Sequence, residues 1–74
     1  MSKKYLPQYQ KLTQKLRHAR LEAGLTQVEV GKKLKKPQAY ISKIERGERR
    51  VDVVELDELA KLYNKPIEYF VAKK

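Results

Sequence analysis

Apolar residues recur along this chain at the three- and four-residue intervals of helices that bury one face. Leu12, Leu16, Ala19 and Ala23, for example, fall on one side of a helix over 8–23. No stretch keeps the strict alternation of apolar and polar residues that a half-buried strand requires. The pattern therefore predicts an all-α fold. Its five helices are expected at residues 8–23, 27–34, 38–46, 53–63 and 66–71.

Capping residues support these boundaries. Glu29 follows Thr26 by three residues, and Glu55 follows Asp52 by three. This is the spacing of a capping box, in which two side chains satisfy backbone N–H groups at a helix start. Asn64 is expected to end the helix before it, because asparagine tolerates the left-handed backbone conformation.

The sequence predicts a single structural domain. Its 74 residues suffice for a single domain with a modest core. The sequence has no internal repeat, low-complexity tract or long linker. We therefore predict one domain over residues 1–74, with residues 1–7 as a flexible N-terminal arm.

What the sequence lacks argues against several classes of function. It has no cysteine, which excludes disulfides and thiolate metal sites. No apolar run approaches the ~20 residues of a transmembrane helix, and the N-terminus lacks the apolar core of a signal peptide. His18 is the only histidine and is interpreted as a surface residue. We expect a cytoplasmic protein that is not an enzyme and uses no metal, cofactor or membrane.

Positive charge is concentrated in the first fifty residues. The net charge is +9. Residues 1–50 hold fourteen Lys or Arg and four Glu, whereas residues 51–74 hold four Lys and five acidic residues. Such asymmetry is typical of a protein with one half facing a polyanion. From charge alone, a basic protein with no anionic partner remains an equal alternative.

The predicted helix at 38–46 has a face suited to reading DNA bases. Ile41 and Ile44 fix its buried side. The opposite side presents Gln38, Ala39, Ser42 and Lys43. A glutamine can bond adenine through two hydrogen bonds, an alanine can contact a thymine methyl, and serine and lysine can bond base edges. Glu45 is the only acid on this helix and needs a separate explanation.

Beyond this helix, a longer pattern is present. It comprises Leu16-Arg17, Arg20, Gly24-Leu25-Thr26-Gln27, Val30-Gly31, Leu34, Gln38, Ile41-Ser42-Lys43-Ile44-Glu45, Gly47 and Leu59-Ala60. In order and spacing it resembles the Cro/CI (Xre-type) helix-turn-helix DNA-binding repressors over about residues 12–71. The resemblance implies a five-helix lambda-repressor-like bundle, with helices two and three as the helix-turn-helix.

The resemblance also implies roles for individual residues. Gln38, Ala39, Ser42 and Lys43 stand where this family reads bases. Gln27 stands where a residue contacts phosphate and braces the first residue of the recognition helix. Tyr40 and Arg46 stand where members often contact phosphate. Arg20 and Glu45 match a structural ion pair, which would explain the acid at position 45.

Further phosphate contacts are expected from the charge pattern. Four lysines surround the predicted turn: Lys32, Lys33, Lys35 and Lys36. We expect one or two of them, Lys36 foremost, to contact phosphate, although a merely solubilising cluster is the alternative. Arg49 and Arg50 follow the third helix in a loop, and arginine matches phosphate with a rigid fork.

Two positions depart from the usual pattern of the family. Many members have alanine where Gly31 stands and glycine where Lys35 stands. Gly31 loses about 1 kcal/mol of helix propensity, but it would let the next helix approach closely. Lys35 is expected at positive φ, which is costly for a residue with a Cβ.

We therefore expect a sequence-specific regulator of transcription that binds double-stranded DNA. As a repressor, it would bind a pseudo-palindromic operator as a homodimer through helices four and five, with Tyr69 or Phe70 as candidate contacts. The third helix of each copy would enter the major groove. Two alternatives stay open: an antitoxin that binds a toxin and regulates its own operon, and a controller protein of a restriction–modification operon.

Overall fold

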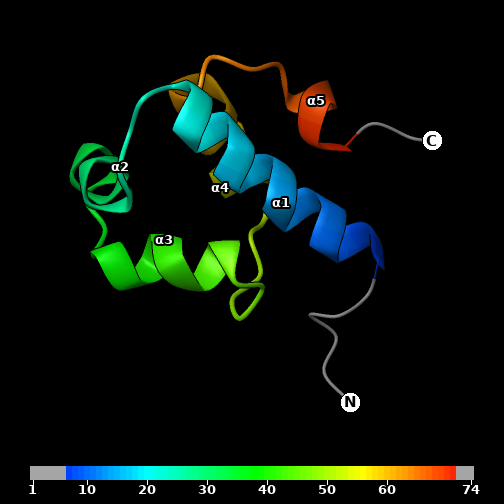
Figure 1. Cartoon of the computed structure of the whole chain (residues 1–74), viewed down its shortest axis with the longest axis horizontal. Coiled ribbons are helices and arrows are strands. Elements are labelled where there is room, and N and C mark those ends of the chain that lie inside the picture. Colours follow the sequence, from blue (N-terminus) through cyan, green and yellow to red (C-terminus); the bar gives the residue numbers. More distant parts are fainter. Residues whose placement is uncertain (1–6, 72–74) are drawn as a thin grey trace.

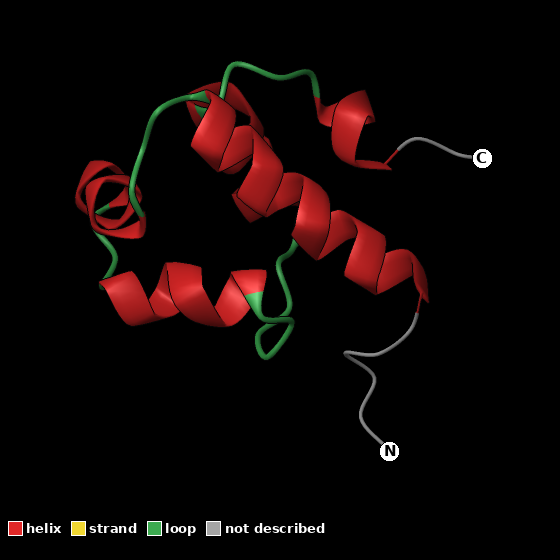
Figure 2. Cartoon of the chain, viewed as in Figure 1, coloured by secondary structure: helices red, strands yellow, loops and turns green. Residues whose placement is uncertain are grey.

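The computed structural model describes residues 7–71, which form five α-helices (Figure 1). They are α1 (Pro7–Glu22), α2 (Gln27–Leu34), α3 (Gln38–Glu45), α4 (Val53–Leu62) and α5 (Ile67–Val71). Within this range the chain contains only helices and their connections, with no strand (Figure 2). The predicted all-α fold with five helices is confirmed.

Four of the five helices differ from the prediction by one residue at one or both ends. α2 has the predicted bounds, whereas α1 starts at Pro7, one residue early. Proline is tolerated in a first helical turn, where its missing N–H is not needed. Pro7, predicted as the last residue of the N-terminal arm, therefore belongs to α1. Residues 1–6, with Lys3 and Lys4, lie outside the described residues.

The predicted caps are present. Thr26 Oγ1 accepts from Glu29 N–H at 3.1 Å, and Glu29 Oε1 accepts from Thr26 N–H at 2.8 Å. Asp52 and Glu55 form the same pair of bonds at the start of α4. Asn64, with φ of 62°, has the expected left-handed conformation after α4. The two capping boxes and the left-handed Asn64 are therefore the local signals from which these helix ends could be predicted.

A single apolar cluster joins the helices. Its buried members are Leu16, Ala19, Val30, Ile41, Ile44, Leu56, Leu59, Ala60, Tyr63 and Phe70. One predicted stripe residue was wrong: Ala23 is exposed, because α1 ends at Glu22 and the chain turns at Gly24. Phe70 is 5% exposed and belongs to the core of one copy, whereas Tyr69, the other candidate for a dimer contact, is half-buried.

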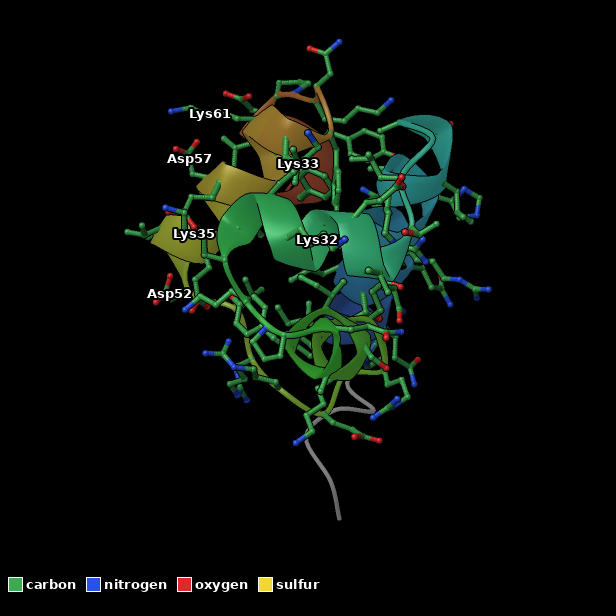
Figure 3. All side chains as sticks on the ribbon, turned by 90° about the vertical axis from the view of Figure 1, so that its left-hand side faces the viewer. Lys32, Lys33, Lys35, Asp52, Asp57 and Lys61 are labelled. Atoms are coloured by element: carbon green, nitrogen blue, oxygen red, sulfur yellow. The ribbon has the colours of Figure 1, made fainter. Side chains whose placement is uncertain are left out.

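α1 forms the centre of the arrangement, and α3 lies at its edge. α1 packs against α3 and α5, α2 packs against α3, and α4 packs against α5. In Figure 1 α2 is seen end-on and α3 from the side, whereas in Figure 3 α2 lies across the view, so these two helices cross. Among the described residues, none of the helices is long and apolar enough to span a bilayer.

The turn between α2 and α3 depends on an unusual residue conformation. Lys35 has φ 60° and ψ 43°, in the left-handed region, as expected from its place in the turn. Its conformation lets Lys36 N–H donate to the Gly31 carbonyl oxygen at 2.8 Å. This bond ends α2 and directs the chain into α3 within three residues.

Candidate nucleic-acid interface

α3 lies along one edge of the fold (Figure 1), and its outward face is polar. Its inner side is anchored by Ile41 and Ile44, each 1% exposed. The outer side carries the four residues predicted to read bases: Gln38, Ala39, Ser42 and Lys43. All are exposed except Ser42, which is half-buried. The structure thus brings these four residues to one solvent-facing surface.

The side chain of Gln38, the first residue of α3, is hydrogen-bonded to a side chain of α2. Gln38 Nε2 donates to Gln27 Oε1 at 3.2 Å. Gln27 Nε2 in turn donates to Glu45 Oε1 at 3.0 Å. Gln27 is half-buried and Gln38 is exposed. The two glutamines therefore connect the start of α3 to a carboxylate at its end.

That carboxylate belongs to a buried ion pair with α1. Arg20 Nε and Nη2 donate to the two Glu45 oxygens at 2.6 and 3.0 Å. Arg20 Nη1 donates to the Leu25 carbonyl at 2.9 Å. The two side chains are 9% and 5% exposed. The hydrogen bonds to Glu45 raise the pKa of Arg20. Because the pair is neutral, α3 carries an acid without repelling an anionic partner.

On the other flank of α3, Tyr40 stacks with two cations. The Arg49 guanidinium lies 4.5 Å from the ring centroid of Tyr40, and Lys36 Nζ lies 5.2 Å from it. Burial raises the pKa of Tyr40, and the charge of Glu55 adds to the rise. Cations over an aromatic face are held by the ring quadrupole. The flank is therefore an ordered cationic surface.

Arg49 is also bound within the protein. Its Nη1 and Nη2 donate to the two carboxylate oxygens of Glu55 at 3.1 and 3.3 Å, and Nη1 donates to the Arg50 carbonyl at 2.9 Å. Arg50 is exposed, with its guanidinium 5.7 Å from the ring of Tyr9. Of the two predicted arginines, Arg50 is the one whose guanidinium forms no ion pair with a carboxylate of residues 7–71.

Arg46 lies on the outer side of α3, beside the base-reading residues. Its Nη1 donates to Ser42 Oγ, and its Nε and Nη2 donate to Glu48 at 3.2 and 3.0 Å. The Arg46–Glu48 pair is solvent-exposed, with side chains 54% and 39% exposed. Exposed ion pairs of this kind contribute little to stability, so the Arg46 guanidinium can exchange Glu48 for an anion at small cost.

The sequence interpretation missed Tyr9 as part of this surface. Its hydroxyl donates to the Arg49 carbonyl at 2.9 Å and so joins α1 to the loop after α3. Burial raises the pKa of Tyr9. Tyr9 lies three residues before Leu12 and seven before Leu16, on the apolar stripe of α1. That periodicity could have marked it as inward-facing, but nothing in the sequence identified its partner 40 residues away.

The lysines around the turn point in different directions. Lys33 and Lys35 line a shallow groove against α4, together with Glu58 and Lys61. Figure 3 shows Lys33, Lys35 and Lys61 on this side of the molecule. Lys36, by contrast, lies with Tyr40 on the flank of α3. Of Lys33, Lys35 and Lys36, Lys36 is therefore the one that the geometry groups with the α3 surface.

His18 is exposed and lines a separate shallow groove between α1 and α5 with Lys11, Lys15 and Tyr69. Over residues 7–71, no group of three metal-ligating side chains occurs. The candidate site in the described chain is thus the hydrogen-bonded set of polar residues around α3.

Comparisons with known proteins agree with this arrangement. The model of the helix-turn-helix family, of Xre/Cro-CI type, matches residues 16–70. The match spans α2, the turn and α3, and extends through Phe70 in α5. Comparison with curated proteins finds no match.

Proposed function

The chain belongs to this helix-turn-helix family and is a DNA-binding regulator of transcription, and on that premise we propose that it represses transcription by binding a pseudo-palindromic operator as a homodimer. In each copy α3 enters the major groove, where every base pair shows a distinct pattern of hydrogen-bonding groups. The two recognition helices would lie about 34 Å apart on one side of the duplex.

The outer face of α3 carries this proposal. Gln38, Ala39, Ser42 and Lys43 lie together on a helix whose only acid is neutralised internally by Arg20. Each of these side chains matches a base edge or thymine methyl. In this model they set the sequence preference, with Gln38 bonding adenine.

Residues on both flanks would bind phosphate and set the register of α3 on the duplex. Gln27 is on one flank. Tyr40 and the cations near it are on the other. The proposed phosphate contacts are Gln27, Lys36, Tyr40, Arg46, Arg49 and Arg50. Arg46 and Arg49 would have to exchange a carboxylate for a phosphate. Arg50 has no carboxylate partner within residues 7–71 to exchange.

The start of α4 supports a surface for the second copy. Val53 is 68% exposed and Val54 is 65% exposed, the two highest values among the exposed large hydrophobic residues. They follow directly after the loop that carries Arg49 and Arg50. Contact between two copies at these valines would cover the apolar side chains and keep both cationic loops near the centre of the operator.

Selection of bound duplexes from a random pool, followed by sequencing, tests the proposal. We expect an inverted repeat with half-sites one helical turn apart. Gln38→Ala should weaken binding to the selected site by about 1–3 kcal/mol and leave non-specific binding nearly unchanged. Recovery of no motif, or of a single half-site without its repeat, would count against the dimeric operator.

Dimer contact through α4 has its own test. Val53→Asp should shift the protein to monomers in sedimentation experiments and weaken binding to the full operator more than to a half-site. Glu58→Gln, on the same helix, is the control that keeps the valines intact. A Val53→Asp protein that remains dimeric would place the interface elsewhere.

A further inference from the structure

The side chain of Arg46 connects a residue proposed to read bases with a carboxylate just after α3. Its Nη1 donates to Ser42 Oγ, while its Nε and Nη2 donate to the two carboxylate oxygens of Glu48 at 3.2 and 3.0 Å. The Arg46 backbone N–H also donates to the Ser42 carbonyl oxygen, at 3.0 Å. Arg46 is therefore bound to Ser42, one helical turn earlier, through both its backbone and its side chain.

The turn after α3 brings Glu48 to this position. Gly47 has φ of 78°, in the left-handed region that glycine adopts without steric cost. The chain then turns back, and Glu48 N–H donates to the Lys43 carbonyl oxygen at 2.8 Å. The Glu48 carboxylate consequently lies beside the Arg46 guanidinium, although the two residues are only two positions apart.

The bond from Arg46 to Ser42 does not require Glu48 to stay in place. Glu48 binds Nε and Nη2, the two donors on one side of the guanidinium, and leaves Nη1 for Ser42. A phosphate group presents a pair of oxygens that the same two donors can bind. If phosphate replaces Glu48 when DNA binds, the third donor of Arg46 therefore remains on Ser42.

The bond from Arg46 determines which hydrogen-bonding group Ser42 offers to a base. Arginine only donates, so Ser42 Oγ is the acceptor in this bond and keeps its proton for another partner. A hydroxyl that accepts from a charged group becomes a stronger donor, because hydrogen bonds in a chain polarise one another. The adjacent positive charge also repels a second N–H donor. Ser42 is therefore suited to a base edge that presents acceptors, and not to one that presents an NH₂ group.

Guanine is the base that meets this requirement best. In the major groove guanine presents two acceptors, N7 and O6. Cytosine presents an NH₂ donor, adenine presents one acceptor beside an NH₂ group, and thymine presents one acceptor beside a methyl group. The Ser42 hydroxyl, with a positive charge beside it, thus favours guanine at the position that it faces.

We propose that Arg46 is a positioning residue for base recognition: it holds the Ser42 hydroxyl as a hydrogen-bond donor that selects guanine. The proposal rests on the proposed operator binding, and it adds a specificity role to the phosphate contact proposed for Arg46. Without the bond from Arg46, the Ser42 hydroxyl can donate to a backbone carbonyl one turn earlier in α3, as serines within helices do. Its proton is then no longer offered to a base.

Two other roles of Arg46 predict different results. As a phosphate contact only, Arg46 would affect binding to all sequences alike. As a direct reader of guanine, which is a common role of arginine, it would act with or without the Ser42 hydroxyl. The base preference at each operator position, measured with and without that hydroxyl, separates the three roles.

The experiment selects bound duplexes from a random pool with the wild-type chain, Arg46→Lys, Ser42→Ala and the double variant. Lysine keeps the positive charge for phosphate but lacks the rigid fork of arginine, which binds phosphate and Ser42 together. Arg50→Lys makes the same change at another proposed phosphate contact, and Arg17→Lys makes it at an exposed site on α1. Urea unfolding checks that each variant keeps its fold. Duplexes that carry each of the four bases at the affected position are then titrated singly.

We expect Ser42→Ala to remove a guanine preference at one position of each half-site. Arg46→Lys should lower the preference for guanine at that same position by about threefold or more, and leave the preferences at the other positions unchanged. The double variant should have the base preferences of Ser42→Ala alone. Arg50→Lys should change the affinity for all duplexes alike, and Arg17→Lys should reproduce the wild-type profile.

Three outcomes would overturn the inference while operator binding stands. In the first, Arg46→Lys changes affinity but leaves every base preference as in the wild-type chain. In the second, Ser42→Ala removes no guanine preference. In the third, Arg46→Lys still lowers a guanine preference in the Ser42→Ala background, which would make Arg46 itself the base reader. If the wild-type chain selects no motif, the proposed function fails and the inference fails with it.

Discussion

The backbone carbonyl oxygen of Lys36 occupies the space that a Cβ atom on Gly31 would need. An ideal Cβ at Gly31 would lie 2.6 Å from that oxygen, closer than a carbon and an oxygen can pack without displacement. Gly31 lies within α2, and Lys36 lies in the turn between α2 and α3. Gly31 therefore lets the chain after Lys35 return close against α2, and the position of α3 depends on it.

Gly31→Ala should destabilise the protein in spite of the better helix propensity of alanine. Propensity favours alanine by about 1 kcal/mol, but the clash involves backbone that must shift, which costs about 1–3 kcal/mol in a packed region. We expect a net loss of stability in urea unfolding followed by circular dichroism. Val28→Ala, at an exposed site on the same helix, should change it by less than about 0.5 kcal/mol. A Gly31→Ala protein more stable than wild type would refute the steric explanation.

Lys35→Gly should stabilise the protein. Lys35 has φ of 60°, and the left-handed region costs a residue with a Cβ about 1–2 kcal/mol relative to glycine. Glycine also makes the unfolded chain more flexible, which offsets part of this gain. A net increase of about 0.5–1 kcal/mol is expected in urea unfolding. Asn64→Gly is the matched comparison: φ there is 62°, but asparagine already tolerates it, so its gain should be smaller.

The buried ion pair should be the most sensitive polar contact to mutation. Arg20→Met leaves Glu45 as an uncompensated carboxylate, 5% exposed, and removing one partner of such a pair costs about 3–5 kcal/mol. Because a domain of this size has a stability of only about 5–15 kcal/mol, the urea midpoint should fall sharply. Arg17→Met, exposed on the same helix, is the control. The double change Arg20→Met with Glu45→Met should recover part of the loss, since no charge is then left buried.

Local chemistry made the helices and the recognition surface predictable. The start of α2 was predictable because Thr26 and Glu29 form a capping box at the expected spacing. Its end was expected from the place of the turn in the family pattern, since a lysine at position 35 does not by itself favour the left-handed conformation. The apolar positions Ile41 and Ile44 fixed which side of α3 faces outward. The periodic stripe of α1 failed only at Ala23, where the apolar pattern continued past the point at which the helix ends.

Contacts between distant loops were not predictable in the same way. The bond from Tyr9 to the loop after α3 and the pairing of Arg49 with Glu55 depend on the path of the chain through that loop. No spacing rule connects these residues. The pairing of Arg20 with Glu45 was expected only from the family resemblance, and the bond from Gln27 to Glu45 that joins it to Gln38 became visible only in the structure.

Stability should decrease in mild acid because of Glu55. Hydrogen bonds from Arg49, and then from the Asp52 N–H, lower the pKa of Glu55 below its ordinary value of 4.5. A carboxylate with a lower pKa in the folded state contributes stability above the unfolded-state value, and this contribution is lost as the pH falls through the folded-state value. Urea midpoints should therefore fall below about pH 4.5.

Glu55→Gln should weaken this dependence on pH without abolishing it. Glu22 also has a lowered pKa, caused by its hydrogen bond with Lys65, so a smaller slope should remain. Glu58→Gln, exposed on the same helix as Glu55, serves as the control. If Glu55→Gln and Glu58→Gln give the same slope between pH 3 and 6, Glu55 does not carry the effect.

The two arginines after α3 should differ in their effect on DNA binding. Arg49 is held by Glu55 and stacked on Tyr40, whereas the guanidinium of Arg50 is exposed beside Tyr9. Each phosphate contact contributes about 0.9 to the slope of log affinity against log salt concentration. Arg50→Ala should therefore reduce that slope by about 0.9 per copy bound and leave the urea midpoint almost unchanged. Arg49→Ala should lower the urea midpoint, because Glu55 loses its partner, and change the salt slope less.

Fluorescence-anisotropy titrations of a labelled duplex at several salt concentrations measure both slopes. Equal slope changes for the two variants would mean that Arg49 exchanges Glu55 for phosphate when DNA binds.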